Sequence, residues 1–301
     1  MASASWSLDR IIVGIDGSEA SHRAAHWAAK EASLRTAGLT LVGAILPPVA
    51  AAGFGPGLPV SLDALEEIRR AIQEQLDEVA ESLDAPDVAT HIEIGSPAGV
   101  LLEASETALM IAIGSRGLGG FRGLMLGSVS TQVSAHADCP VVVVRDQAAS
   151  AEPRVVLGLD GSEAGLDAAE FAFEMARLHG WSVQAVHAWD VPSYDLLVVP
   201  NAAIPVPLSE TIEDESRLAA ELLAGCTTSH PDVPLHIDVV RASAAKALLA
   251  AGKDASLIVV GTRGHGQVMS ALLGSVSNAV LHKATVPVAI VPQLPSSPAA
   301  A

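Results

Sequence analysis

The stretch "RIIVGIDGSEAS", residues 10–21, joins a short run of β-branched apolar residues to a Gly-Asp-Gly-Ser turn and the start of an alanine-rich segment. The apolar run predicts a buried strand. Ser18 and Ser21 offer a cap for a helix that follows at once, and Gly38 is expected to stop that helix. The same phrase returns as "RVVLGLDGSEAG" at residues 154–165, 144 positions later. A strand followed directly by a helix is the unit from which parallel α/β sheets are built.

The correspondence between the two halves continues to the last strands. The segment "GSVSTQVSAHADCPVVVV" (127–144) matches "GSVSNAVLHKATVPVAIV" (274–291), now at an offset of 147. A repeat unit of about 140 residues is too long for a solenoid, whose period is roughly 20–50 residues. We therefore expect two whole domains in tandem, residues 1–146 and 153–293 of the 301.

Within each half, apolar runs alternate with helical patterns. The first half contains the runs "RIIVGI", "LTLVGAIL", "ATHIEI", "ALMIAI" and "CPVVVVR". Between the second and third runs, apolar residues recur at three-to-four spacing over 61–83, which predicts an amphipathic helix. Because alternating strands and helices imply parallel crossovers, the expected fold class is α/β, with helices packed around one parallel sheet in each half.

Composition and charge exclude several classes of partner. The formal net charge is −17, aromatic residues make up 3% of the chain, and no basic patch stands out in either half. A surface this acidic repels nucleic acid and anionic membranes, and few aromatic rings are available for stacking on bases. We expect neither nucleic acid nor membrane as a partner.

The cysteines and the first residues carry no signal for metal, redox or export. Cys139 and Cys226 have no metal-ligand or redox-motif spacing. Cys139 aligns with Val286 of the second half, so we expect a buried thiol in the core. The opening "MASASWSLDR" lacks the basic start and apolar core of a signal peptide, and the expected location is cytoplasmic.

Two glycine-rich segments follow the fourth strand of each half: "GSRGLGGFRGLMLGSVS" (114–130) and "GTRGHGQVMSALLGSVS" (261–277). In an open parallel sheet, ligands bind beyond the carboxyl ends of the strands, and glycine lets backbone N–H groups approach a ligand closely. A helix that starts near Ser128 directs its positive end to the same place, which predicts a phosphate cradle. Ser128 and Ser130 are expected to add hydroxyl donors, and Arg116 and Arg122 to add positive charge.

The alternative is that these glycines serve only tight turns. The spacing G-x2-G-x9-G-[ST] is nevertheless identical in the two halves, although the intervening residues differ, and this favours ligand binding. Other nucleotide signatures are absent from the sequence: there is no GxxxxGK[ST] loop, and Asp16 stands where a dinucleotide fingerprint would need glycine.

These motifs carry a resemblance that covers nearly the whole chain, once per half. The first strand ending in G-[IL]-D-G-S, the fourth ending in "GSRG" or "GTRG", and the pattern G-x2-G-x9-G-[ST] resemble a tandem universal stress protein of the ATP-binding branch. The resemblance implies two five-stranded parallel α/β domains, Rossmann-like and similar to adenine nucleotide alpha hydrolases. It also implies ATP as the ligand, with or without Mg²⁺.

The resemblance assigns binding roles in both halves. Asp16 and Asp160 would face the ribose–adenine side or a metal, Gly14 and Gly158 would line the pocket, and Ala44 and Ala188 would offer main-chain groups to the adenine. The residues that would wrap the ribose and phosphates are Gly114, Ser115, Arg116, Gly117, Leu118, Gly119, Gly120, Gly127, Ser128 and Val129 in the first half, and Gly261, Thr262, Arg263, Gly264, His265, Gly266, Gly274, Ser275 and Val276 in the second.

Two of these assignments have plain structural alternatives. Asp16 is of a type that often caps a helix, although Ser18 lies closer to the expected helix start. Arg116 and Arg263 are equally consistent with solvated surface charges. We also expect unequal affinities, with the first half better suited to a triphosphate, because Arg122 aligns with Met269.

The leading functional interpretation is a binding module that holds an adenine nucleotide and changes its conformation or its affinity for an unidentified regulatory protein. No residue is obviously placed to activate a water, so we assign no catalytic residue. The alternatives are a weak ATPase or self-phosphorylating enzyme acting through Ser128, and a scaffold with degenerate pockets. By analogy with the family, the apolar last strands, 140–144 and 287–291, are expected to pair the two domains as an intrachain pseudo-dimer, and two chains to associate as a homodimer.

Overall fold

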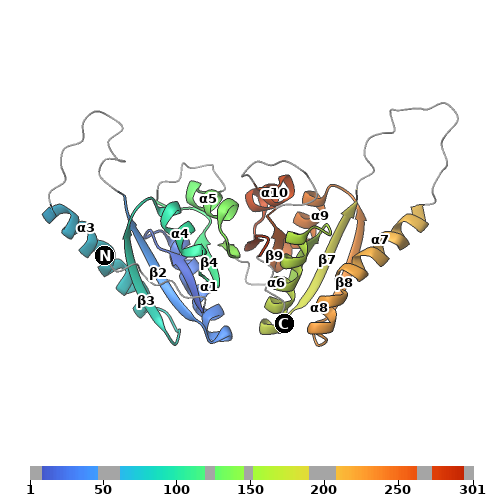
Figure 1. Ribbon diagram of the computed structural model, residues 1–301, viewed down its shortest axis with the longest axis horizontal. Helices are drawn as coiled ribbons and strands as arrows, with labels where there is room; N and C mark the ends of the chain where they lie inside the picture. The colour runs from blue at the N-terminus through green and yellow to red at the C-terminus, as the bar shows by residue number, and fades with distance from the viewer. Residues whose placement is uncertain are drawn as a thin grey trace, which may run out of the picture. The chain divides into compact units, whose positions relative to one another are not determined.

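The computed structural model describes residues 9–46, 62–118, 126–145, 152–189, 208–262 and 273–294. The chain divides into two compact units, one holding the strands β1 to β5 and the other β6 to β10 (Figure 1). Each unit is a parallel sheet with helices packed against it, as the alternating pattern predicts.

The first unit runs from β1 to β5 in the expected order of strands and helices. Its strand order is β3-β2-β1-β4-β5, and all neighbouring strands are parallel. The order reverses between β1 and β4, which is where open α/β sheets bind their ligands. The elements are β1 (Arg10–Gly14), α1 (Glu19–Arg35), β2 (Gly38–Ile45), α3 (Leu62–Glu81), β3 (Val88–Ile94), α4 (Pro97–Ser105), β4 (Met110–Gly114), α5 (Ser128–His136) and β5 (Val141–Val144).

The second unit repeats this topology, with strand order β10-β9-β6-β7-β8 and all neighbours parallel. The short helix α8 and the turn η2 have no counterpart among the described elements of the first unit. The elements are β6 (Glu152–Leu159), α6 (Glu163–His179), β7 (Ser182–Trp189), α7 (Leu208–Leu222), α8 (Ala224–Ser229), β8 (Leu235–Arg241), α9 (Ala244–Ala251), η2 (Gly252–Asp254), β9 (Ala255–Gly261), α10 (Ser275–Lys283) and β10 (Val288–Val291).

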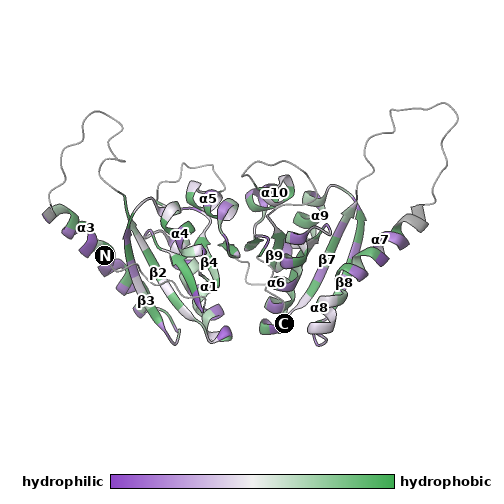
Figure 2. Cartoon of the chain, in the orientation of Figure 1, coloured by the Kyte–Doolittle hydropathy of each residue, from purple (hydrophilic) through white to green (hydrophobic). Residues whose placement is uncertain are grey.

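Small aliphatic residues fill the core between sheet and helices. The central strands are mostly apolar, whereas α3 and α7 each carry a hydrophilic face (Figure 2). Alanines 24, 25, 28 and 32 of α1 are fully buried, and this allows the helix to lie close to the sheet. A Cβ added at Gly114 would lie 2.6 Å from the backbone carbon of Ala20, so β4 ends in glycine because α1 passes directly over it.

Helix α1 begins as predicted but ends differently. Ser18 is its N-cap, and the Ser18 Oγ accepts a hydrogen bond from the Ser21 amide. The helix ends where Thr36 adopts a left-handed conformation with φ of 54°, and Gly38 already belongs to β2. The prediction that Gly38 stops the helix is therefore wrong. Glycine is needed at position 38 for another reason, since a Cβ there would meet the guanidinium of Arg10.

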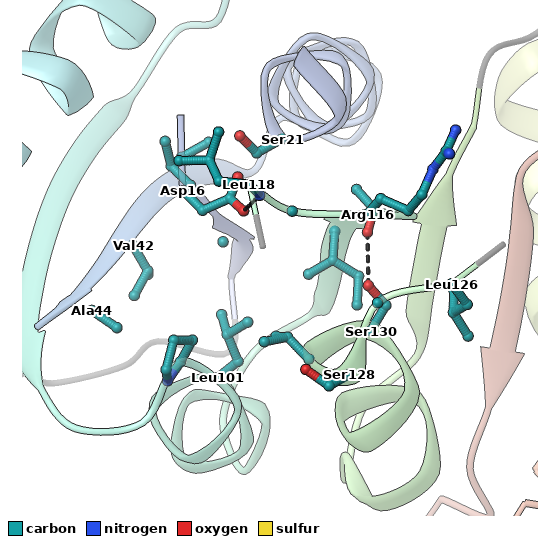
Figure 3. A pocket seen from close by; sticks show the side chains of 18 of the residues that line it. Asp16, Ser21, Val42, Ala44, Leu101, Arg116, Leu118, Leu126, Ser128 and Ser130 are labelled. Atoms are coloured by element: carbon teal, nitrogen blue, oxygen red, sulfur yellow. Dashed lines mark hydrogen bonds between the residues drawn. The ribbon is translucent and has the colours of Figure 1, made fainter. Parts of the chain in front are cut away.

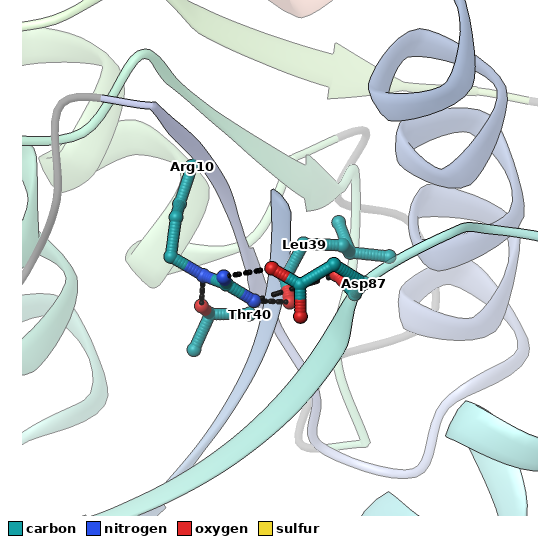
Figure 4. Close-up of polar contacts among 4 residues, drawn as sticks. All are labelled: Arg10, Leu39, Thr40 and Asp87. Carbon is teal, nitrogen blue, oxygen red and sulfur yellow. Dashed lines mark hydrogen bonds and ion pairs between the residues drawn. The ribbon is translucent and has the colours of Figure 1, made fainter. Parts of the chain in front are cut away.

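Arg10 ties together the amino-terminal ends of β1, β2 and β3 (Figure 4). Its Nε donates to Thr40 Oγ1 at 2.7 Å, its Nη2 to the Leu39 carbonyl oxygen at 2.6 Å, and its Nη1 to Asp87 Oδ2 at 2.5 Å. Asp87 immediately precedes β3. The cluster therefore lies at the sheet edge opposite to the carboxyl ends, and it serves the fold.

Both cysteines are buried, as predicted for Cys139. Cys139 is 4% exposed and Cys226 is 8% exposed. Burial raises the pKa of the Cys139 thiol to about 12, and burial followed by the nearby Glu170 carboxylate raises the pKa of Cys226 to about 11. Both thiols therefore stay protonated at neutral pH. None of the described helices is long and apolar enough to cross a membrane.

Candidate functional site

A cavity of about 590 Å³ lies in the first unit, beyond the carboxyl ends of β1, β2 and β4 (Figure 3). This is the size of a small-molecule site, roughly 300–1,000 Å³. Helices α3, α4 and α5 complete its wall. The lining residues are Gly14, Ile15, Asp16, Ser21, Val42, Ala44, Ile72, Gln75, Pro97, Leu101, Ile113, Gly114, Arg116, Gly117, Leu118, Leu126, Gly127, Ser128, Val129 and Ser130.

Most residues predicted for the first half gather around this cavity. The exception among the described ones is Ser115, which is 7% exposed and belongs to the backbone support. Its amide donates to the Val144 carbonyl oxygen, and its own carbonyl oxygen accepts from the Gly127 amide. Gly119, Gly120 and Arg122 lie outside the described residues. The predicted residues that line the cavity are Gly14, Asp16, Ala44, Gly114, Arg116, Gly117, Leu118, Gly127, Ser128 and Val129.

Asp16 anchors the glycine segment to the first strand. Its Oδ1 accepts from the Ser18 amide at 3.0 Å, and its Oδ2 accepts from the Leu118 amide at 3.1 Å. Ser18 supplies the helix cap, so capping does not account for Asp16. A Cβ on Gly117 would collide with Asp16 Oδ2, so this glycine allows the segment to pass over the carboxylate.

Ser130 holds the start of α5 against the end of β4. Its Oγ donates to the Gly114 carbonyl oxygen at 2.8 Å, and Ser277 makes the same bond to Gly261 at 2.6 Å. Sequence analysis assigned the Ser130 hydroxyl to the ligand, whereas the structure uses its proton to join helix and strand. Ser128, one residue into the helix and exposed, keeps the expected position.

The N-terminus of α5 faces the cavity. Gly127 is the N-cap and makes no side-chain cap, and the first intrahelical bond is donated by the Thr131 amide. The amides of Ser128, Val129 and Ser130 therefore lie in the first turn, where N–H groups have no intrahelical acceptor and the helix dipole is positive. An anion is the natural ligand of such an end.

Gly127 differs from Gly114 and Gly117. Among the described residues, a Cβ added at Gly127 would have no neighbour nearer than 3.7 Å, which is an ordinary van der Waals contact. Packing against the described part of the chain therefore does not require glycine at this position. The space that a side chain would take lies at the cavity wall, next to the first amides of α5.

The opposite end of the cavity is apolar. Val42 and Ala44 of β2 lie there in Figure 3, and Ile72, Pro97 and Leu101 approach from α3 and α4. Sequence reasoning did not assign Ile72, Gln75, Pro97 or Leu101, because their helices carry no motif and only the tertiary fold brings them to the strand ends. The cavity thus joins an apolar end that fits a flat ring to a polar end that fits an anion.

Positive charge collects beside the polar end. Arg116 is exposed at the mouth, and Arg145 follows β5. Burial lowers the pKa of Arg145, and the positive charge of the neighbouring Arg116 lowers it further. Sequence reasoning missed Arg145, which has Pro292 as its counterpart in the second half at the offset of 147.

The second unit repeats several of these supports. Gly158 approaches Leu248 as Gly14 approaches Leu101, with a distance of 3.0 Å from the added Cβ to the leucine Cδ1 in both units. Asp160 Oδ1 accepts from the Ser162 amide at 3.0 Å and from the Ser162 hydroxyl at 2.7 Å.

The other predicted residues of the second unit that the structure describes lie on or next to the expected elements. Gly274 is the N-cap of α10, Ser275 and Val276 begin that helix, and the Gly274 amide donates to the carbonyl oxygen of Thr262. Ala188 lies in β7, and Gly261 ends β9. The residues that lie outside the described part of the chain are Arg263, Gly264, His265 and Gly266. Over the described residues of both units, no group of three or more His, Cys, Asp or Glu side chains could hold a metal ion.

Comparison with known proteins gives one consistent family. The family model described as "Universal stress protein family" matches residues 7–145 and again 153–292. A universal stress protein from Mycolicibacterium smegmatis is 40% identical over 289 residues, which cover 93% of this chain and 96% of its own. One from Mycobacterium tuberculosis is 36% identical over 298 residues, 96% of this chain and 98% of its own.

A solved structure supports the fold. The crystal structure of a universal stress protein from Archaeoglobus fulgidus aligns with a TM-score of 0.70 at 23% identity, covering 95% of this chain and 98% of that one. The tandem arrangement and the Rossmann-like α/β class expected from the sequence are both confirmed.

Proposed function

The chain belongs to the universal stress protein family, and from this we propose that it is a nucleotide-responsive binding module whose two domains each hold one ATP. The observation that carries the proposal is the cavity of about 590 Å³ in the first unit. It joins an apolar wall to the uncapped N-terminus of α5, and this combination suits a ligand with a flat ring at one end and phosphates at the other.

Each part of the ligand has a matching part of the wall. The adenine would lie against Val42, Ala44 and Leu101, with the edge of the ring toward the end of β2. The phosphates would lie at the first amides of α5, with Arg116 at the mouth. Gly127 supports this orientation, since no described residue lies nearer than 3.7 Å to a Cβ placed there.

Binding without rapid hydrolysis follows from the position of Asp16. Both of its carboxylate oxygens accept hydrogen bonds from backbone amides, so the side chain serves to hold the loop and not to activate a water. We expect phosphate release from ATP to stay at background, and release that depends on Asp16 would support the enzymatic alternative.

Mass spectrometry and calorimetry test the proposal. Purified protein is denatured and the released small molecules are identified by mass, which establishes the nucleotide that it carries. ATP is then titrated into the wild type, Gly127→Glu and Gly225→Glu. Gly225 is a control, because a Cβ there meets no described atom within 4 Å, just as a Cβ on Gly127 meets none nearer than 3.7 Å, yet Gly225 lies on α8, which contributes no residue to the cavity.

Gly127→Glu places a bulky carboxylate beside the phosphate position and is expected to abolish one of two binding events. Gly225→Glu is expected to bind as the wild type does. Absence of binding by the wild type at millimolar ATP, or unchanged binding by Gly127→Glu, would contradict the proposal.

A further inference from the structure

The second unit contains a polar pair, a buried histidine and a partly exposed glutamate, at a point where the first unit is apolar. His187 of β7 is 8% exposed, and its Nδ1 lies 3.0 Å from the Leu159 carbonyl oxygen at the end of β6. Its Nε2 lies 2.9 Å from Glu215 Oε2, which comes from α7. The function proposed above makes no use of this pair.

The position of His187 corresponds to that of Gly43 in the first unit. Gly43 pairs with Ile92 in the register of β2 and β3, and His187 pairs with Val239 in the register of β7 and β8. A Cβ on Gly43 would lie 2.5 Å from Ile72 Cγ2 and 3.5 Å from Leu76 Cδ1. The side chain of histidine would therefore not fit in the first unit.

The facing helix has changed together with the strand. In the first unit, Ile72 of α3 lies over Gly43. In the second unit, Glu215 of α7 takes the corresponding position and contacts His187. One turn later, Leu76 of α3 is matched by Ala219 of α7, and both are fully buried. The smaller alanine leaves volume for the imidazole. The three positions thus differ together between the units. The first unit has Gly43, Ile72 and Leu76, and the second has His187, Glu215 and Ala219.

The two hydrogen bonds fix the orientation of the imidazole ring. A carbonyl oxygen only accepts, so the Nδ1 of His187 carries a proton that it donates to Leu159. The Nε2 on the other side of the ring lies against Glu215 Oε2, so the histidine in turn holds the carboxyl group in place. A polar pair of this kind gains little for stability over an apolar pair of similar volume, so packing alone does not account for it.

The location of the pair indicates that role. Ile72 lines the apolar end of the first unit's cavity, and Ile15, the counterpart of Leu159, lines it as well. In the second unit Glu215 stands at the Ile72 position, with 29% of its side chain exposed, so its carboxylate is accessible. At this position the first domain has the apolar side chain of Ile72, whereas the second has the carboxylate of Glu215, which can accept a hydrogen bond.

We propose that Glu215, held in place by His187, is a specificity-determining residue that accepts a hydrogen bond from the exocyclic amino group of a purine base in the second domain. The inference rests on the proposed function and deepens it. The first domain, with Ile72 at this position, recognises the base by shape. A site built to bond a polar group rejects an analogue that lacks the group, since the buried acceptor is left without its donor.

The experiment compares ATP with purine riboside 5′-triphosphate, which differs only by the missing 6-amino group. Each domain is studied in the full chain by calorimetry, with the other site blocked by Gly127→Glu or Gly274→Glu. With the first site blocked, loss of the amino group is expected to weaken binding about tenfold or more. With the second site blocked, we expect a change of less than about threefold, because a shape-based contact loses little.

Two variants test whether the preference for ATP over the analogue depends on His187 and Glu215. The double substitution His187→Gly with Glu215→Ile gives the second domain the side chains of the first, and the preference for ATP over the analogue is expected to fall to the first domain's value. The isosteric Glu215→Gln, which removes the charge with little change in volume, is expected to reduce the preference as well. The ratio of the two affinities is the readout, since general loosening would weaken both ligands alike.

The outcomes separate the two proposals. Equal ratios in the two domains, or a ratio unaffected by both variants, would overturn the role of Glu215 while ATP binding stands. Absence of ATP binding in both blocked proteins, with the wild type also silent, would overturn the proposed function and this inference together.

Discussion

Gly114, Gly117 and Gly127, the described glycines of the first unit's glycine-rich segment, have different surroundings. Gly114 allows α1 to pass over the end of β4, and Gly117 allows the chain to cross the carboxylate of Asp16. Among the described residues, none constrains position 127 in this way. The motif therefore combines positions that the packing requires with one that leaves space at the cavity wall, and substitutions should separate the two.

Gly117→Ala is expected to lower mainly the stability of the protein, and Gly127→Ala to lower mainly its affinity for ATP. At position 117 the new methyl group meets Asp16 Oδ2, so the free energy of unfolding should fall by about 1 to 3 kcal/mol, as for other overpacked sites. At position 127 the loss should stay below about 1 kcal/mol, which is the size of a helix N-cap effect, while ATP affinity falls. Urea denaturation and calorimetry measure the two quantities, and equal stability losses would contradict this division.

Cys139 makes the free energy of unfolding depend on pH, which its counterpart Val286 cannot do because valine has no ionisable group. The folded-state pKa of about 12 lies above the ordinary value of 9.0, so the unfolded chain loses the proton first. The unfolded state therefore binds fewer protons, and the free energy of unfolding should fall as pH rises from about 9 toward 12. Below that window the thiol contributes no slope.

The variant Cys139→Val tests this by borrowing the residue found at the same place in the second unit. Wild type and variant are expected to differ by less than about 1.5 kcal/mol at neutral pH, because the swap nearly conserves volume. The variant should gain relative to the wild type between about pH 9 and about pH 10.5 in urea denaturation. Parallel curves over that range would show that the thiol does not stay protonated when folded.

Arg10 joins three strands of the first unit at the edge of the sheet where these strands begin. The guanidinium bonds side chains and a carbonyl from β2 and from the start of β3, so it links three strands. Asp87 is 62% exposed, so solvent screens its ion pair, whereas the bonds to Thr40 and Leu39 are partly buried. Most of the stabilisation should therefore come from the bonds within β2.

Arg10→Met and Asp87→Asn distinguish these contributions. Arg10→Met leaves the Thr40 hydroxyl and the Leu39 carbonyl without their donor, and the free energy of unfolding should fall by about 1 to 3 kcal/mol. Asp87→Asn removes only the screened charge and should cost less than about 1 kcal/mol. Chemical denaturation with both variants checks the order, and a larger loss for Asp87→Asn would contradict it.

The helices and strands show which features of the fold can be predicted from the sequence. The strands follow from β-branched runs, and the starts of α1 and α5 follow from Ser18 and Ser128, because these signals act within a few residues. The end of α1 at Thr36 was missed, since a left-handed threonine leaves no mark in the sequence. Ile72 and Leu101 were missed because their part in the cavity depends on packing between distant segments.

For the chain as a whole, duplication followed by divergence produces two similar domains with different polar groups. The strand order and the helix-to-strand bond of Ser130 and Ser277 are shared. The charges near the end of the last strand are not shared: Arg145 lies near Arg116 in the first unit, and Pro292 takes its place in the second. Comparison of the halves could predict this from the sequence only after the fold had brought Arg145 next to Arg116.

We expect the first domain to bind ATP more tightly than the second, by about threefold to tenfold, which corresponds to roughly 1 kcal/mol from partly exposed charge contacts. Phosphates would offset the repulsion between Arg116 and Arg145, so the gain should shrink from ATP to AMP, which carries fewer phosphate charges. Calorimetry on the Gly274→Glu variant measures the ATP affinity of the first site, and calorimetry on the Gly127→Glu variant measures that of the second. Arg145→Met should weaken ATP binding at the first site only, so the affinities of the two sites should become more similar. Equal constants in the two blocked proteins would contradict the argument, since the charges that separate the domains would then not reach the ligand.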